Sequence, residues 1–386
     1  MRSSQAAPPR VVVALSGGVD SAVACALLVE QGYEVIGLMM RLWAETGVDR
    51  SPFNRCCSLE AVEDARAVCR HLGIPFYVLN YEEPFLKQVV SPFVVDYVHG
   101  RTPNPCLACN RYLKFGLLLQ RALALDARYL ATGHYARIRQ VGDRWQLWRG
   151  RDPEKDQSYA LYMLGQHELE HTLFPVGELL KDEVREIARR KGLPVAAKPE
   201  SQEICFIADN DYRRFLMGQA PEAFRPGPIV DRAGHVLGQH RGLPCYTVGQ
   251  RKGLGIAAPE PLYVLEVDVA HNALIVGPAR ELGASALLAE EVNWVAGEEP
   301  AAAVEATVVI RLHGTEAPAT VYPLPGQRAR VAFARPQRDI TPGQAAVFYG
   351  GPVVLGGGKI VQALDVEREA GRSDVKRETS GVKREA

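Results

Sequence analysis

Short apolar runs alternate with amphipathic segments along the first part of the chain. Residues 11–15, 35–40, 76–79 and 129–132 are apolar runs of the length that buried strands have. Between and after them, the spacing of apolar positions predicts helices up to Gln31, over 59–71, around 85–97, over 112–125 and over 182–191. Strands that alternate with helices predict an α/β fold, with a doubly wound parallel sheet covered by helices on both faces.

The pattern changes after the fourth strand. Residues 135–139 and 145–148 flank Gly142-Asp143, which predicts a hairpin, and β-like runs recur at 304–311, 319–322, 329–333 and 345–349. We therefore expect an N-terminal α/β domain over 1–208, a small central domain over 209–280 and a C-terminal β-barrel over 281–366. Residues 367–386 are highly charged and lack aromatics, so we expect a disordered tail.

Charge and cysteine usage narrow the classes of function. Lys plus Arg and Asp plus Glu are equal at 45 each, so any nucleic-acid binding must use a local basic surface. We find no signal peptide and no apolar run long enough to cross a bilayer, so we expect a cytoplasmic protein with no membrane partner. The eight cysteines should then be reduced unless they are catalytic, metal-bound or redox-active.

The segment between the first strand and the first helix carries the clearest chemistry. It reads Ala14, Leu15, Ser16, Gly17, Gly18, Val19, Asp20, Ser21. Two glycines let the backbone approach a ligand, and the first N–H groups of a helix point at an anion. The serines add hydroxyl donors, and Asp20 is a candidate ligand of the Mg²⁺ that accompanies a nucleotide. The loop lacks a Walker lysine and the G-x-G-x-x-G spacing. It resembles the SGGxDS loop of ATP pyrophosphatases; the alternative is an ordinary glycine turn.

Two further stretches contain cysteines in informative surroundings. In the segment 100–115, two prolines predict a rigid loop, Asn104 is suited to bond an exposed base edge, and Cys109 is expected at the start of a helix beside Arg111 and Lys114. Such surroundings favour a reactive thiol. Cys205 lies between apolar residues that predict a strand, where a buried structural cysteine is the more frequent outcome.

These stretches together resemble the bacterial tRNA-specific 2-thiouridylases, ATP pyrophosphatases that place sulfur on the wobble uridine. Further motifs of the family occur in the same order at 131–135, 155–159, 173–178, 249–255 and 341–345. The resemblance extends over most of the chain. It implies an N-terminal catalytic domain like the adenine nucleotide alpha hydrolases, followed by a central domain that contacts tRNA.

The resemblance implies a role for each matching residue. Residues 14–21 would bind ATP, Asp20 would act in catalysis, and Met40 and Gly133 would complete the nucleotide pocket. Cys109 matches the nucleophile and Cys205 the persulfide carrier. The remaining matches face the tRNA: Asn104, Pro105 and Cys106 at the target base, and His134, Lys155, Asp156, Gln157, Arg311, Leu312 and Gln344 elsewhere. ATP, Mg²⁺, tRNA and a persulfide donor, either a cysteine desulfurase or a sulfur relay protein, are the implied cofactors and partners.

The mechanism stays open between a Cys109–Cys205 disulfide and a covalent Cys109–uridine intermediate. Either one requires the two cysteines to approach each other through closure of a mobile segment. The rival functions are an amidotransferase-type ATP pyrophosphatase, which predicts a glutaminase domain or partner, and a non-catalytic RNA-binding protein with a degenerate nucleotide fold.

Two positions depart from the family pattern. Cys106 replaces the usual Asp of the base-facing segment and creates a C-x-x-C with Cys109, and Leu312 replaces a Tyr after Arg311. The C-x-x-C has three interpretations: a redox pair, two ligands of a metal or Fe–S site completed by Cys205, or an incidental Cys beside one nucleophile. We do not favour the cluster and predict no metal ligands, since a structural zinc site would want a second such pair.

Overall fold

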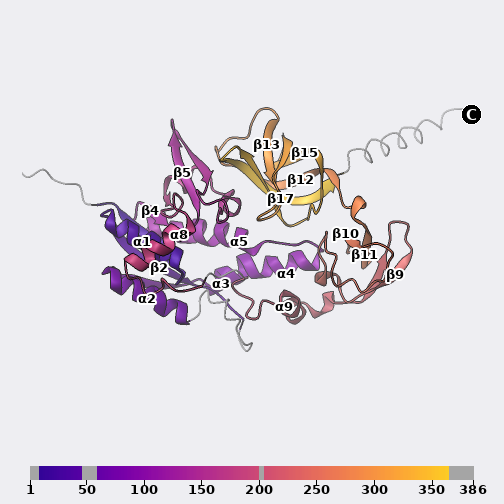
Figure 1. Ribbon diagram of the computed structural model, residues 1–386, viewed down its shortest axis with the longest axis horizontal. Helices are drawn as coiled ribbons and strands as arrows, with labels where there is room; N and C mark the ends of the chain where they lie inside the picture. The colour runs from indigo at the N-terminus through magenta and orange to yellow at the C-terminus, as the bar shows by residue number, and fades with distance from the viewer. Residues whose placement is uncertain (1–7, 46–58, 200–203, 365–386) are drawn as a thin grey trace, which may run out of the picture.

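The computed structural model describes residues 8–45, 59–199 and 204–364. Figure 1 shows an α/β region, drawn in indigo to magenta, a small central region beside it, and a β-barrel in orange and yellow that lies against both. The predicted α/β class with a central domain and a C-terminal barrel is confirmed. No helix in the described ranges has the length and apolar character that a membrane crossing requires.

A five-stranded parallel sheet forms the N-terminal region, in the order β3-β2-β1-β4-β7. Its strands are β1 (Arg10–Ala14), β2 (Glu34–Arg41), β3 (Phe76–Asn80), β4 (Tyr129–Ala131) and β7 (Thr172–Leu173). The chain builds the sheet outward from β1 to β3 on one side and then returns to place β4 on the other side. This reversal beside β1 is the switch point where ligands of doubly wound sheets bind.

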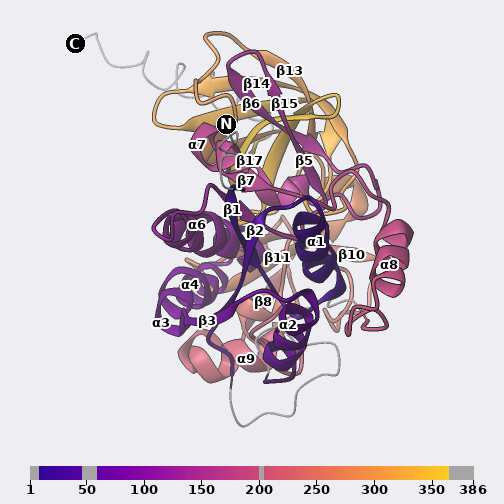
Figure 2. The same ribbon diagram turned by 90° about the vertical axis from the view of Figure 1, so that its left-hand side faces the viewer.

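Helices cover both faces of the sheet, as Figure 2 shows. Val11 and Val13 of β1 face α1 (Val19–Glu30) and α2 (Leu59–Leu72), whereas Val12 faces the opposite layer, which includes α6 (Leu119–Leu123). All three valines are fully buried, which explains the continuous apolar run. The other α-helices of this region are α3 (Glu82–Phe85), α4 (Ser91–Val98), α5 (Pro105–Ala108), α7 (Gln166–Glu170) and α8 (Lys181–Arg190).

Two segments differ from the sequence-based expectation. The helix predicted over 112–125 begins at Pro105 and ends at Leu123, running through α5, a π-helical stretch Cys109–Leu118 and α6. Pro105 suits a first helical position because its missing N–H has no intrahelical partner there, and Asn104 Oδ1 accepts a hydrogen bond from the backbone N–H of Cys106 (3.1 Å). Cys109 is therefore in the second turn of this helix.

The strand predicted around Cys205 is wrong. Ile204 O accepts a turn hydrogen bond from the N–H of Ile207 (3.2 Å), and Cys205 lies inside that turn. The adjacent Phe206 is enclosed edge-on by Phe85 and Phe93, with ring centroids 5.7 and 5.3 Å away. Consecutive apolar residues here anchor a turn in an aromatic cluster and do not alternate between the faces of a sheet.

The central region contains a helix and a small sheet. The helix α9 (Tyr212–Gln219), which the sequence analysis did not predict, is capped by Asp211, whose side chain accepts from the N–H groups of Arg213 and Arg214. The four-stranded sheet has the order β10-β11-β8-β9. Its strands are β8 (Gly227–Val230), β9 (Val236–His240), β10 (Leu262–Asp268) and β11 (Ala273–Pro278).

Six strands close the C-terminal barrel, because β12 pairs with both β15 and β17. They are β12 (Ala284–Trp294), β13 (Val304–Val309), β14 (Ala317–Leu324), β15 (Arg328–Gln337), β16 (Ala345–Gly350) and β17 (Val353–Leu364). The sequence analysis named four of them and missed β12 and β17, whose pairing is interrupted by bulges. The predicted hairpin, β5 (Ala136–Val141) and β6 (Arg144–Arg149), extends this sheet through β17 and joins the two domains.

Candidate functional site

The loop between β1 and α1 has the geometry of an anion site. Gly17 adopts φ +73°, and a Cβ there would lie 2.5 Å from the carbonyl oxygen of Ala61, so the position requires glycine. The backbone N–H of Ser16 donates to Ser21 Oγ (3.2 Å), which itself donates to Gly18 O (3.1 Å). Gly18 is the N-cap residue of α1, and no side chain caps this helix end. The first N–H groups of α1 are therefore directed at the space where an anion would bind.

Gly133 holds the neighbouring segment against this loop. It follows β4, and a Cβ on it would lie 2.6 Å from the backbone nitrogen of Ser21. A larger residue would push the start of α1 away from the sheet. Gly133 thus allows the close approach of the two backbones, and Met40 from the end of β2 contributes an apolar side chain to the cavity beside them.

Asp20 is held by two partners that the sequence analysis did not identify. Lys181 Nζ, at the start of α8, lies 2.7 and 2.9 Å from the two carboxylate oxygens, and the Tyr135 hydroxyl donates to Oδ1 (2.8 Å). The Lys181 side chain is 9% exposed and that of Asp20 is 32% exposed. The sequence offered one signal for such a partner: the loop over residues 14–21 contains no lysine, so a cation near it has to come from another element.

One cavity of about 350 Å³ joins the loop to the cysteines. Cys109 from the π-helical stretch is 8% exposed, Cys205 is half-buried in its turn, and Cys106 is exposed on the first turn of α5. All three line the cavity, so residues 109 and 205 meet in one chamber despite their separation in the sequence. The other predicted site residues on its wall are Ala14, Leu15, Ser16, Asp20, Ser21, Met40, Pro105, Gly133, His134 and Gln157.

His134 is neutral in this site. Burial holds the pKa of His134 well below its usual range, and the nearby Lys114 ammonium lowers it further. Its Nδ1 lies 2.7 Å from Thr132 Oγ1 and its Nε2 lies 3.4 Å from Lys114 Nζ. Since Lys114 can only donate, Nε2 accepts and Nδ1 carries the proton that is donated to Thr132. Lys114 is the one Lys or Arg among the described residues that line the cavity.

Gln157, which lines the cavity, and the neighbouring Asp156 are both expected to face tRNA. Gln157 Oε1 accepts from the Tyr135 N–H (3.0 Å), and Asp156 Oδ1 accepts from the N–H groups of Gly150 (2.9 Å) and Ser158 (3.0 Å). Both side chains therefore shape the backbone beside Lys155.

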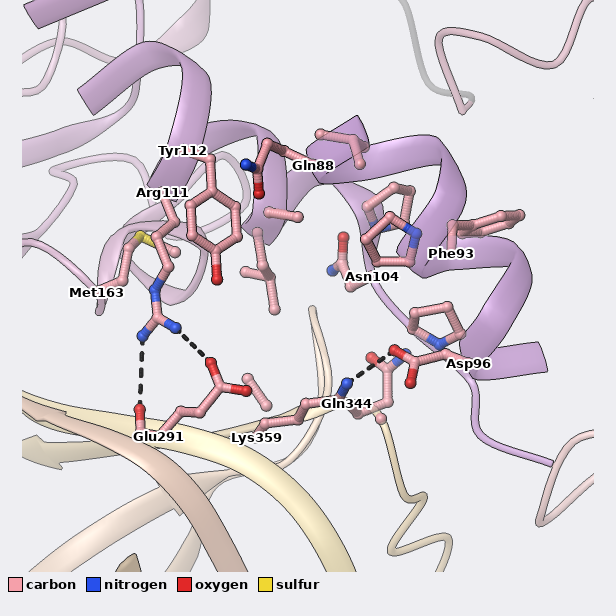
Figure 3. A pocket seen from close by; sticks show the side chains of 18 of the residues that line it. Gln88, Phe93, Asp96, Asn104, Arg111, Tyr112, Met163, Glu291, Gln344 and Lys359 are labelled. Atoms are coloured by element: carbon pink, nitrogen blue, oxygen red, sulfur yellow. Dashed lines mark hydrogen bonds and ion pairs between the residues drawn. The ribbon is translucent and has the colours of Figure 1, made fainter. Parts of the chain in front are cut away.

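Three predicted tRNA-facing residues come from the barrel. Arg311 and Leu312 are exposed after β13, with Arg311 Nη1 3.3 Å from Asp339 Oδ2. Gln344 Nε2 donates to Thr102 O (2.7 Å) and lies with Asn104 on a neighbouring pocket, shown in Figure 3.

Other cysteines are remote from this chemistry. Cys25 and Cys69 are buried in the core, and burial raises the pKa of the Cys69 thiol to about 12. The adjacent Cys56 and Cys57 belong to a segment for which the sequence predicts a loop, and both lie outside the described residues. In the part of the chain that the structure describes, no three His, Cys, Asp or Glu side chains are arranged to hold a metal ion.

Comparison with known proteins agrees with this architecture. Three family models match consecutive segments: tRNA methyl transferase HUP domain at residues 9–209, tRNA methyl transferase PRC-barrel domain at 213–278 and aminomethyltransferase beta-barrel domain at 284–360. The chain is 52% identical to the tRNA-specific 2-thiouridylase MnmA of Symbiobacterium thermophilum, over 92% of this chain and 93% of that one.

Two further relatives give the same result. The tRNA-specific 2-thiouridylase MnmA of Moorella thermoacetica is 53% identical over 92% of this chain and 100% of that one. The enzyme of the same name from Heliobacterium modesticaldum is 51% identical over 97% and 98%. These matches confirm the resemblance drawn from the motifs: the chain belongs to the family of the tRNA-specific 2-thiouridylases.

Proposed function

We propose that this chain is a tRNA-uridine 2-sulfurtransferase, which uses ATP to activate the wobble uridine of tRNA and replaces its O2 with sulfur from a protein persulfide. The observation that carries the proposal is the single cavity that the nucleotide loop shares with Cys109 and Cys205. In this scheme residues 1–208 perform the chemistry, and residues 209–280 and the barrel over 281–366 hold the tRNA.

The first step is adenylation. The uracil O2 attacks the α-phosphorus of ATP, pyrophosphate leaves, and the N3 proton is released, which makes O2 part of a good leaving group. The helix N-terminus at Gly18 and the Ser16 hydroxyl bind phosphate oxygens, Ser21 Oγ holds the loop in shape through its bonds to Ser16 and Gly18, and Lys114 on the cavity wall offsets charge.

The residues present fit a Mg²⁺ ion that takes a single carboxylate ligand from the protein. Asp20 is the one acidic side chain among the described residues that line the cavity, so an ion here would take one carboxylate and the phosphates of ATP, as Mg²⁺ commonly does. When bound, the ion supplies charge compensation to the phosphates. Lys181 fixes the position of the Asp20 carboxylate by contacting both of its oxygens.

The second step transfers sulfur. The terminal sulfur of a Cys205 persulfide attacks C2, and AMP leaves. The Cys109 thiolate then attacks the sulfur that is bonded to Cys205, so that a Cys109–Cys205 disulfide forms, the original S–S bond breaks, and N3 regains a proton. A dithiol reductant restores both thiols. A covalent Cys109–uridine intermediate is the alternative, and no Fe–S cluster enters either route.

The persulfide must come from a donor protein, either a cysteine desulfurase or a sulfur relay protein, that reaches Cys205. Asn104, Pro105 and Cys106 form the wall that meets the target base. His134, Lys155, Asp156, Gln157, Arg311, Leu312 and Gln344 contribute further tRNA contacts. Because the substrate is tRNA, we place the enzyme in the cytoplasm.

Transfer of radiolabelled persulfide sulfur to tRNA, assayed with and without ATP, tests the proposal. We expect label in tRNA only when ATP is present, together with release of AMP and pyrophosphate. Pyrophosphate release without labelled tRNA would favour an amidotransferase-type enzyme, and tRNA binding without pyrophosphate release would favour a non-catalytic RNA-binding protein. Iron and sulfide analysis of anaerobically purified protein is the companion measurement, since thiolation that depends on bound iron would contradict the cluster-free scheme.

A further inference from the structure

A second pocket lies behind the wall that meets the target base. It has a volume of about 220 Å³ and is enclosed by α4, the turn of α5, the π-helical stretch and the barrel strands β12 and β17 (Figure 3). Val89 and Pro105 line both this pocket and the reaction cavity. One helical turn, α5, thus separates the two chambers, with Cys106 and Cys109 facing the cavity and Leu107 and Ala108 facing the second pocket.

The lining of this pocket combines an aromatic ring with side-chain amides. Tyr112 is 40% exposed, and Figure 3 shows its ring and hydroxyl extending into the open space between the helices and the barrel. Gln88, Asn104 and Gln344 place carboxamides around the same space, from three different segments. Asn104 Oδ1 already accepts from the Cys106 N–H, and Gln344 Nε2 already donates to Thr102 O. Gln88 and the amide oxygen of Gln344 provide hydrogen-bonding groups of the kind that match a nucleobase edge, and aromatic rings stack on unpaired bases.

Among the described residues, the four charged side chains that line the pocket form two ion pairs with one another. Arg111 Nη1 lies 2.6 Å from Glu291 Oε2, and Lys359 Nζ lies 2.8 Å from Asp96 Oδ2. Both pairs join the helices of the N-terminal domain to the barrel, and Figure 3 shows the two on opposite sides of the pocket. Because each cation already has a carboxylate, the pocket suits a neutral heterocycle better than a phosphate group.

We propose that this pocket binds the base of a nucleotide that directly flanks the target uridine in the same RNA strand. The inference rests on the proposed function, because it takes the reaction cavity to be the place of the target base. The nucleotide loop and the cysteines lie in that cavity, so the second pocket is left for a neighbour in the strand. Tyr112 stacks on the flanking base, and Gln88 and Gln344 contact its edge.

A cycle of protein and RNA changes tests the proposal. Anticodon stem-loop RNAs are prepared with the intact anticodon, with an abasic site 5′ of the target uridine, or with one 3′ of it. Each is measured with the wild-type protein, Tyr112→Ala and Tyr112→Phe, both for the rate of pyrophosphate release and for the Kd at fixed salt. Tyr77→Ala is the matched control, since Tyr77 is 57% exposed on β3 and lines neither chamber.

Compared with the wild-type protein and the intact RNA, we expect Tyr112→Ala alone to raise the Kd by about 5- to 150-fold, the range for loss of one aromatic stack. One of the two abasic sites alone should raise the Kd by a similar factor. Combined, they should raise the Kd no further than either alone, and Tyr112→Phe should retain the wild-type values. If the effects of Tyr112→Ala and of the abasic site on Kd multiply in full at both flanking positions, Tyr112 does not contact either flanking base and the proposal is wrong. If no RNA supports pyrophosphate release, the proposed function is wrong. The Kd values still test the base-binding pocket in that case, so the two failures can be distinguished.

Discussion

The carboxylate of Asp20 offsets the charge of a lysine that is almost fully buried, so replacing Asp20 with Asn should affect stability and catalysis separately. The Lys181 side chain is 9% exposed and both carboxylate oxygens of Asp20 contact its ammonium. Breaking a buried pair costs about 3–5 kcal/mol and an exposed pair about 0–1 kcal/mol. Since the Asp20 side chain is 32% exposed, we expect Asp20→Asn to cost about 2 kcal/mol.

Removal of the lysine as well separates the two effects. In Asp20→Asn/Lys181→Met no buried charge is left without a partner, so we expect more than half of the lost stability to return. Adenylation should not return, because the Asp20 carboxylate that would hold Mg²⁺ is still absent. Asp20→Asn alone should lower tRNA-dependent pyrophosphate release by on the order of 100-fold or more.

Thermal unfolding and pyrophosphate release measured on the same samples provide the assay. A loss of about 2 kcal/mol should lower the Tm by about 4–8 °C in a domain of this size. An Asp20→Asn protein as stable as wild type, or a double variant less stable than the single one, would refute the charge argument. Undiminished pyrophosphate release in Asp20→Asn would refute the catalytic role.

Three further predictions concern the cavity. Cys109→Ser and Cys205→Ser should each abolish thiolation while ATP and tRNA binding survive; thiolation that persists in either variant contradicts the two-cysteine scheme. Gly133→Ala should weaken ATP binding at least tenfold by calorimetry, whereas Gly218→Ala, where a Cβ meets nothing within 4 Å, should leave it unchanged. Because burial keeps the pKa of His134 well below 6.5, the unfolded chain binds a proton there that the folded chain does not. The free energy of unfolding should therefore fall as pH drops below about 6.5, and it should fall less in His134→Gln. Urea unfolding at several pH values measures both slopes, and equal slopes would argue against a neutral His134.

The order of strands and helices in the α/β region follows from the sequence because the central strands β1 and β4 are buried on both faces and appear as apolar runs. The apolar run of β1 and the glycines after it placed the nucleotide loop at the correct edge. The barrel strands β12 and β17 escaped prediction since bulges interrupt their pairing, and Gly356 to Gly358 replace alternating side chains where strands cross closely. A side chain at Gly356 would collide with the backbone of Asn293.

The sequence indicates candidate site residues that belong to a local motif, but it does not reveal contact partners that are distant along the chain. The motifs predict site roles for residues 14–21, Gly133, Cys109 and Cys205, and the structure places Gly133 and both cysteines on one cavity. The ion pair of Lys181 with Asp20 spans 161 positions, and nothing local in α8 marks that lysine. The π-helical register after Cys109 likewise depends on packing against the barrel and the sheet, so the sequence predicted only a later α-helix there.

The central claim is that one uridine of tRNA exchanges O2 for sulfur at the expense of ATP. Mass spectrometry of wobble uridines from tRNA incubated with the enzyme, ATP and a persulfide donor tests this most directly. We predict that 2-thiouridine accumulates only when all components are present, and that Cys205→Ser yields none. Wobble uridines left unmodified by active, ATP-cleaving enzyme, or sulfur found at another nucleoside, would contradict the assignment.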